Sequence, residues 1–213
     1  MKTRDAALAG LALMAAALLY TLFVYPELPD RVPTHWNWVG EADAWGYKSW
    51  AVTLLPGVMA LSVALMAALP RLSPAQFGVS TFRPTFNYLM LVAAGAMGFI
   101  HIVMLQSALH PQMAASRILI GGLFVTLALL GNMLGKVRRN FWMGVRTPWT
   151  LSSDKVWNAT HRLAAQLFVA CGLLGAAAVW LGTPAPAAML LLAPAVLIPV
   201  VQSFLLARRE SRQ

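Results

Sequence analysis

Charged residues are scarce in this sequence. They make up 11% of the 213 residues, against about 25% in a typical soluble domain. Acidic residues are the scarcest, with 7 Asp and Glu against 16 Lys and Arg. Hydrophobic residues make up 59% of the chain, and the mean hydropathy is +0.67. This composition excludes a soluble globular domain and is typical of an integral membrane protein.

Cysteine and catalytic motifs are also nearly absent. Cys171 is the only cysteine and lies in an apolar stretch, so an intrachain disulfide is excluded. The chain has no H-E-x-x-H motif, no paired intramembrane aspartates and no evident nucleophile–base pair, so we predict a protein that is not an enzyme. The formal charge of +9 is basic. Because Lys and Arg gather beside membrane spans, we expect anionic lipid as the partner and no direct contact with nucleic acid.

Six apolar segments are each close to the ~20 residues that cross a bilayer. They cover residues 6–25, 50–69, 88–109, 118–134, 163–181 and 187–206. Such segments must be helical, because lipid offers no partner to backbone N–H and C=O groups. The first segment is longer than the apolar core of a cleaved signal peptide, so we expect it to be retained. The predicted fold is an all-α membrane bundle of six transmembrane helices.

The basic residues predict the orientation of this bundle. Thirteen Lys and Arg lie on the side of both termini and of residues 135–162, and three lie on the other side. The positive-inside rule therefore places both termini in the cytoplasm of a bacterium, with the protein in its cytoplasmic membrane. The eight tryptophans lie in or beside the two long loops or at a span end, which is typical of interfacial aromatic belts or of pocket walls.

The spans and loops divide the chain into three parts. Residues 1–69 form a two-span module with an outer loop at 26–49, and residues 70–117 hold the third span and its connectors. Residues 118–213 form a second module with an inner loop at 135–162. Each half carries its long loop between its first and second span. An inverted 3+3 repeat, as in many transporters, is therefore an alternative organisation.

The inner loop is richer in polar and aromatic residues than a simple connector needs. Gly144 allows the backbone to turn, and Pro148 biases Thr147 toward an extended conformation. Arg146 between them is thus expected to point in a definite direction. Its guanidinium can bind a carboxylate, a lipid phosphate or the carbonyls of a helix end.

A helix is expected to run from this loop into the fifth span, with Thr150 or Ser152 as its N-cap. On that helix Asp154, Trp157 and His161 share one face. Two interpretations remain open. The helix is interfacial with a solvated polar side, or a polar cluster ties the loop under the bundle or binds a ligand. That cluster would contain Asn132, Asn140, Arg146, Asp154 and His161.

The outer loop is mildly acidic and is expected to form a compact cap on the bundle. Pro29 and Pro33 exclude a regular helix at its start, and Gly40 and Gly46 predict turns. Its candidate functional residues are Asp30, His35, Trp38, Gly40 and Lys48. The acidic residues and the histidine match no metal-ligand spacing, so we predict no metal site and no cofactor.

His101 lies near the middle of the third predicted span. An ionisable side chain at that depth is a functional candidate. A neutral histidine that is hydrogen-bonded to a neighbouring helix is the alternative interpretation.

The inner loop resembles the signature of the SdpI family of bacterial membrane proteins. The resemblance is carried by Gly131, Asn132, Asn140, Gly144, Val145, Arg146, Thr147, Pro148, Trp149, Thr150, Leu151, Ser152, Val156, Trp157, Thr160, His161 and Arg162. The outer loop resembles a short uncharacterised module that precedes this signature in many members. Pro33, His35, Gly40 and Lys48 carry that second match.

This resemblance implies a non-enzymatic immunity protein that protects the cell from a secreted peptide toxin. In some members it also implies binding of a small transcriptional repressor at the membrane. Functional residues are then expected at Asn132, Asn140, Arg146, Thr147, Pro148, Trp149, Asp154, Trp157, His161 and Arg162. The competing interpretation is a six-span transporter or export channel with His101 near its path. It predicts a polar cavity that reaches the middle of the membrane.

Overall fold

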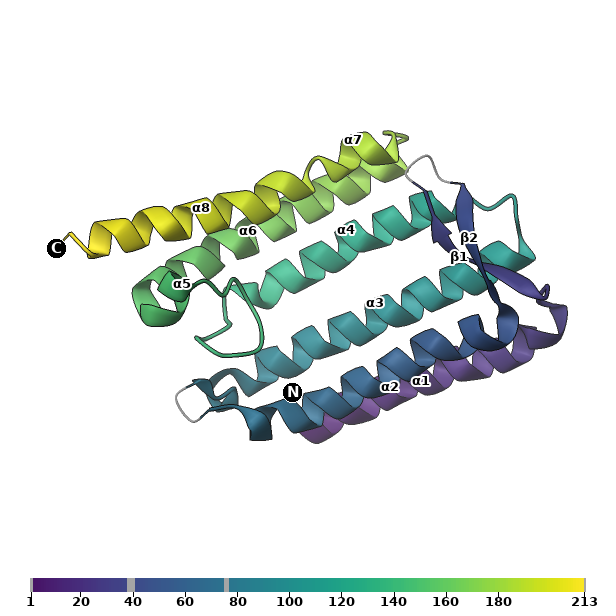
Figure 1. Ribbon diagram of the computed structural model, residues 1–213, viewed down its shortest axis with the longest axis horizontal. Coiled ribbons are helices and arrows are strands. Elements are labelled where there is room, and N and C mark those ends of the chain that lie inside the picture. Colours follow the sequence, from purple (N-terminus) through teal and green to yellow (C-terminus); the bar gives the residue numbers. More distant parts are fainter. Residues whose placement is uncertain (1, 38–40, 75–76, 213) are drawn as a thin grey trace.

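The fold is a bundle of membrane-spanning helices, shown in Figure 1 as a computed structural model. The structure describes residues 2–37, 41–74 and 77–212. Within these ranges, six helical segments are long and apolar enough to cross a membrane. They contain α1 (Thr3–Val24), α2 (Lys48–Leu72), α3 (Arg83–Leu109), α4 (Ala115–Leu134), α6 (Asp154–Trp180), and α7 (Ala185–Met189) followed by α8 (Leu192–Glu210). The predicted multi-pass helical membrane bundle is confirmed.

The helices form two halves. In the first half α1, α2 and α3 all pack against one another, and in the second half α6 packs against both α4 and α8. The contact between α3 and α4 joins the halves. Figure 1 shows both termini and the short helix α5 (Pro148–Ser152) at one end of the bundle, and two strands at the other. We call these the basic end and the hairpin end.

The surface around the helices is apolar, as contact with lipid requires. Large side chains such as Leu19 and Phe23 of α1 are 67% and 79% exposed. The last span is broken between α7 and α8, two residues ahead of Pro194. Proline is tolerated in the first turn of a helix, where its missing N–H has no intrahelical partner to lose.

The outer loop folds into a β-hairpin, which the sequence analysis did not predict. Strand β1 (Arg31–Trp36) pairs antiparallel with β2 (Ala42–Tyr47). The prediction of a turn at Gly46 is wrong, because Gly46 lies inside β2 opposite Val32. The turn predicted at Gly40 falls outside the described residues. The hairpin caps the first half, since Val32 is fully buried against Val24, Leu28 and Leu105.

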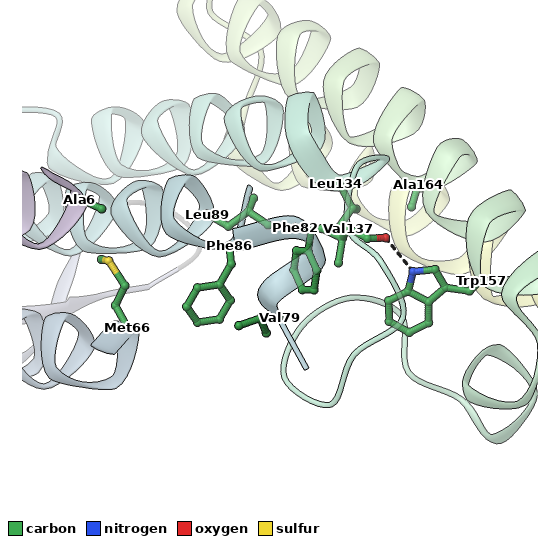
Figure 2. Close-up of a cluster of buried hydrophobic side chains, with 10 residues drawn as sticks. All are labelled: Ala6, Met66, Val79, Phe82, Phe86, Leu89, Leu134, Val137, Trp157 and Ala164. Atoms are coloured by element: carbon green, nitrogen blue, oxygen red, sulfur yellow. Dashed lines mark hydrogen bonds between the residues drawn. The ribbon is translucent and has the colours of Figure 1, made fainter. Parts of the chain in front are cut away.

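One cluster of buried side chains at the basic end connects both halves (Figure 2). It contains Ala6, Met66, Val79, Phe82, Phe86, Leu89, Leu134, Val137, Trp157 and Ala164. Two of these residues follow α2 in the segment around η3 (Ser80–Phe82), and Val137 follows α4. The clusters nearer the hairpin end each stay within one half. The halves are thus packed together most firmly at the basic end.

Candidate functional site

The loop between α4 and α6 has little regular structure, and Asn140 organises it. Its side chain is fully buried. The Nδ2 atom donates to the carbonyls of Arg138 at 2.8 Å and Met143 at 3.0 Å. The Oδ1 atom accepts from the backbone N–H groups of Trp142 at 2.7 Å and Met143 at 2.8 Å. All the hydrogen-bonding capacity of this amide is therefore spent on shaping the loop.

Gly144 turns the loop back onto α6. Its φ angle is +108°, a left-handed value that the predicted turn requires and that side chains disfavour. The turn places the N–H of Val145 3.0 Å from Nε2 of His161, while Nδ1 of His161 lies 2.8 Å from the carbonyl of Trp157. A neutral ring with its hydrogen on Nδ1 satisfies both contacts. His161 is fully buried and therefore holds the loop rather than facing solvent.

Trp157 holds the loop at a second point, one turn earlier on α6. Its ring is fully buried in the cluster of Figure 2 and stacks on His161, with ring centres 4.0 Å apart. Its Nε1 donates to the carbonyl of Val137 at 2.8 Å. The structure thus favours a cluster that ties the loop under the bundle over a helix with a solvated polar face.

Two other tryptophans pin the loop to the remaining helices. Nε1 of Trp142 donates to Ser73 at the end of α2, and Nε1 of Trp149 donates to Ser203 in α8, both at 2.7 Å. Trp149 also packs edge-on against Phe204, with ring centres 5.5 Å apart. Each indole N–H of the loop therefore has a specific protein partner, which an aromatic belt alone does not require.

Helix α5 begins where the family signature reads Thr147-Pro148. Thr147 is extended, as predicted, and forms a capping box with Thr150, whose hydroxyl also donates to the carbonyl of Val145 at 2.8 Å. The predicted N-caps Thr150 and Ser152 are wrong. The chain makes two helices instead of one, and the N-cap of α6 is Ser153, which also donates to Glu210 at 2.8 Å.

Arg146 is exposed, and Nη1 of its guanidinium donates to the carbonyl of Phe141 across the loop. It does not meet Asp154, whose carboxylate pairs with Nε of Arg139 at 2.9 Å and is 71% exposed. The expected cluster is therefore only partly assembled. Asn140 and His161 belong to the loop's buried framework with Gly144 and Trp157, whereas Asn132, Arg146, Asp154 and Arg162 lie on its surface.

Sequence reasoning missed the residues that receive the loop. They are Ser73, Ser203 and Glu210, and a serine or glutamate on a helix carries no signal of such a role.

The candidate residues of the outer loop engage one another. Nδ1 of His35 lies 2.5 Å from Oδ1 of Asp43, and Nζ of Lys48 lies 3.1 Å from the carbonyl of Leu28 and 3.7 Å from Asp30. The structure does not describe Trp38 and Gly40. Among the residues that it does describe, no group of three or more His, Cys, Asp or Glu could hold a metal ion.

His101 bridges two helices of the first half. Its side chain is fully buried, and Nε2 lies 2.7 Å from the hydroxyl of Thr21 in α1. That hydroxyl donates to the carbonyl of Ala17 at 2.8 Å, so Nε2 of His101 must carry the hydrogen. This contact between α1 and α3 uses one ring nitrogen. It agrees with the interpretation of His101 as a neutral histidine that is hydrogen-bonded to a neighbouring helix.

Comparisons with known proteins match both loops. The SdpI/YfhL protein family matches residues 136–205, and a domain of unknown function, DUF1648, matches residues 12–60. The chain is 24% identical over 165 residues to the immunity protein SdpI of Bacillus subtilis, which covers 78% of this chain and 77% of the relative. An uncharacterised protein of Archaeoglobus fulgidus is 38% identical over 68 residues, 31% of this chain and 37% of that protein. No solved structure matches the chain.

Proposed function

We propose that this chain, as a member of the SdpI family, is a non-enzymatic membrane immunity protein that protects its cell from a secreted antimicrobial peptide. The observation that carries the proposal is the similarity to an immunity protein over 78% of this chain and 77% of the relative. The inner loop supports it, because the matched signature residues build a fixed framework around Asn140, Trp157 and His161. The functional roles of the surface residues Asn132, Arg146, Asp154 and Arg162 are part of this proposal, as are those of the outer-loop residues.

The test is expression of the chain in a sensitive strain that is challenged with membrane-active peptides, including the toxin of the immunity system to which the relative belongs. Survival should rise with the amount of inserted protein, and the peptide should be recovered intact. Unchanged killing at high expression would exclude the immunity function, and degraded peptide would indicate an enzyme.

We place the hairpin end outside the cell and the basic end in the cytoplasm. The basic end carries 13 of the 16 Lys and Arg residues, and the positive-inside rule follows that bias. A reporter that is active only in the cytoplasm should therefore be active after Lys136 or Gln213 and silent after Asp43. Activity of the fusion at Asp43 would reverse the proposed orientation.

A second candidate function is binding of a small transcriptional repressor at the cytoplasmic face. The supporting observation is the set of exposed basic side chains on the inner loop, which include Lys136, Arg138, Arg146 and Arg162. Such a surface can bind acidic groups of a soluble protein, and it also attracts anionic lipid headgroups.

A transporter or export channel has less support. The cavity between α3 and α4 is lined mainly by apolar side chains, and His101 does not line it. The two halves also pack differently: α1, α2 and α3 all contact one another, whereas the larger contacts of the second half are those of α6 with α4 and α8.

Arg146→Lys should insert normally but lose most of the protection. Arginine presents a planar fork of five donors, whereas lysine presents a single ammonium group. One N–H of Arg146 is already bonded to the carbonyl of Phe141, which holds the rest of the fork toward solvent for an acidic partner group. Hydrogen bonds to charged groups contribute roughly 1.5–3 kcal/mol, which is more than a tenfold change in affinity at the upper value.

The assay is survival under toxin, with membrane abundance measured in parallel. Arg138→Lys is the matched control, because Arg138 is an exposed basic residue of the same loop. Full protection by Arg146→Lys would show that the arginine acts only as a topological charge.

A further inference from the structure

A cavity opens between α3 and α4 directly under the hairpin. Its volume is about 370 Å³. The wall is mainly apolar, with Ala96 and Phe99 from α3 and Leu119 and Leu123 from α4, and His35 and Trp36 of β1 form its lip. A second cavity of about 440 Å³ shares Ala96 and Phe99 and continues along the same two helices to Leu129. An apolar chain can therefore enter at the hairpin and lie between the two halves of the bundle.

The position of this cavity follows from the packing of the halves. The cluster that joins them lies at the basic end, and the other two clusters do not cross from α3 to α4. Gly122 of α4 preserves the shape of the wall. A Cβ atom there would lie 2.1 Å from the ring of Phe99, so a larger residue would force that ring to move.

The lip of the cavity is acidic. Asp43 is hydrogen-bonded to the lining residue His35 at 2.5 Å. The backbone N–H of Glu41 donates to Oδ1 of the lining residue Asn37 at 2.9 Å, and the Nδ2 of Asn37 lies 3.4 Å from the Glu41 carboxylate. Two carboxylates are therefore hydrogen-bonded to residues of the lip, and no Lys or Arg lines the cavity among the residues that the structure describes.

The basic residues of the hairpin end are engaged elsewhere. Arg117 donates to the carbonyls of Val179 and Trp180 at the end of α6, at 2.9 Å and 2.8 Å. Lys48 donates to the carbonyl of Leu28, and the guanidinium of Arg31 lies 4.8 Å from the ring centre of Tyr47. The mouth thus combines an apolar interior with two carboxylates that pair with no Lys or Arg of the described residues.

We propose that this cavity binds an amphipathic cation, with its apolar part between α3 and α4 and its positive group at Asp43 and Glu41. The proposal rests on the proposed function. It identifies the occupant as a part of the toxin peptide in which apolar side chains lie beside a Lys or Arg. The acidic mouth disfavours anionic lipid headgroups, because like charges repel at close range. Ligand sites of this kind are apolar cavities of roughly 300–1,000 Å³ with a few polar groups that fix orientation.

The test uses two probes that share one apolar chain and differ in charge, dodecyltrimethylammonium and dodecyl sulfate. Each carries a bromine on the chain, and binding to the purified protein in neutral lipid nanodiscs is measured as quenching of tryptophan fluorescence. The quenching lost in Trp36→Phe reports the cavity, since Trp36 lines it. We expect the cation to bind roughly tenfold more tightly, which is about 1.4 kcal/mol, because opposite charges attract at close range.

Three variants separate charge from shape. Glu41→Gln with Asp43→Asn should abolish the preference for the cation, because both side chains are hydrogen-bonded to lining residues. Glu27→Gln with Asp30→Asn should keep it, because no described lining residue is bonded to either of these carboxylates and Asp30 pairs with Lys48. Ala96→Phe should weaken both probes by filling the cavity. Equal binding of the two probes, or a preference that survives in the first variant, would overturn the proposal.

The source of the cation is tested by a short amphipathic peptide of Leu and Lys, which should compete with the bound dodecyltrimethylammonium. A peptide in which Glu replaces Lys should not compete, and failure of the Lys peptide would overturn the assignment to a toxin. These measurements do not depend on survival assays. Absence of protection in cells would instead remove the proposed function and leave cation binding by the purified protein intact.

Discussion

Gly144→Ala is expected to leave little folded protein in the membrane. The residue has a φ angle of +108°, and holding an alanine in such a region costs roughly 1–3 kcal/mol. The added Cβ would also lie 2.2 Å from Nε2 of His161. That ring cannot retreat easily, because it is fully buried and stacked on Trp157. Separation of the two would break the hydrogen bond from Val145, and a buried polar group left unpaired costs about 1–3 kcal/mol more.

The single thiol of the chain provides the measurement. Cys171 is buried in α6, so its labelling by a maleimide dye during heating reports unfolding of the helix that carries His161. The midpoint should fall by on the order of 10 °C, at roughly 2–4 °C for each kcal/mol. Gly95→Ala is the control, since a Cβ at that helical position meets nothing within 4 Å. Its midpoint should stay or rise, because alanine favours helix over glycine.

A double variant separates the two causes. Gly144→Ala with His161→Ala removes the steric conflict but keeps the backbone strain, so the two substitutions should be less harmful together than their separate effects predict. Unfolding of Gly144→Ala at the temperature of the unaltered protein would contradict the assigned role of this glycine.

The features that depend on local sequence were predictable. The length of the apolar segments determined the six spans, since a helix is the only way for a single segment to satisfy its backbone in lipid. The turn at Gly144 and the extended conformation of Thr147 also follow from local preferences, the freedom of glycine and the restriction before Pro148.

The features that depend on distant partners were not predictable. The hairpin has short strands, and its pairing begins between Arg31 and Tyr47, which are sixteen residues apart. Asp154 lies on the same helix face as Trp157 and His161 by periodicity, yet it sits at the first turn of α6 and pairs outward with Arg139. Periodicity assigns a residue to a helix face, whereas depth in the bundle decides whether that residue is buried.

Asn140→Asp should be nearly as damaging as Gly144→Ala, although the two side chains of this substitution have almost the same shape. A carboxylate can still accept from the N–H groups of Trp142 and Met143. It cannot donate to the carbonyls of Arg138 and Met143, which would then face a negative charge at 2.8 Å and 3.0 Å. Each of these partly buried carbonyls left without its donor costs up to about 1–3 kcal/mol. The loop that presents Arg146 would lose its framework, and protection should fall with stability.

Acid should partly rescue this variant. A protonated carboxyl group regains one O–H donor, so the folded loop favours the protonated acid over the charged one. The deficit in melting midpoint should therefore shrink as the pH falls and grow as the pH rises. Asn132→Asp is the matched control, since this asparagine of the signature is exposed at the end of α4 and should tolerate the charge at every pH. If Asn140→Asp instead melted like Asn132→Asp at neutral pH, the amide of Asn140 could not be what holds the inner loop in place.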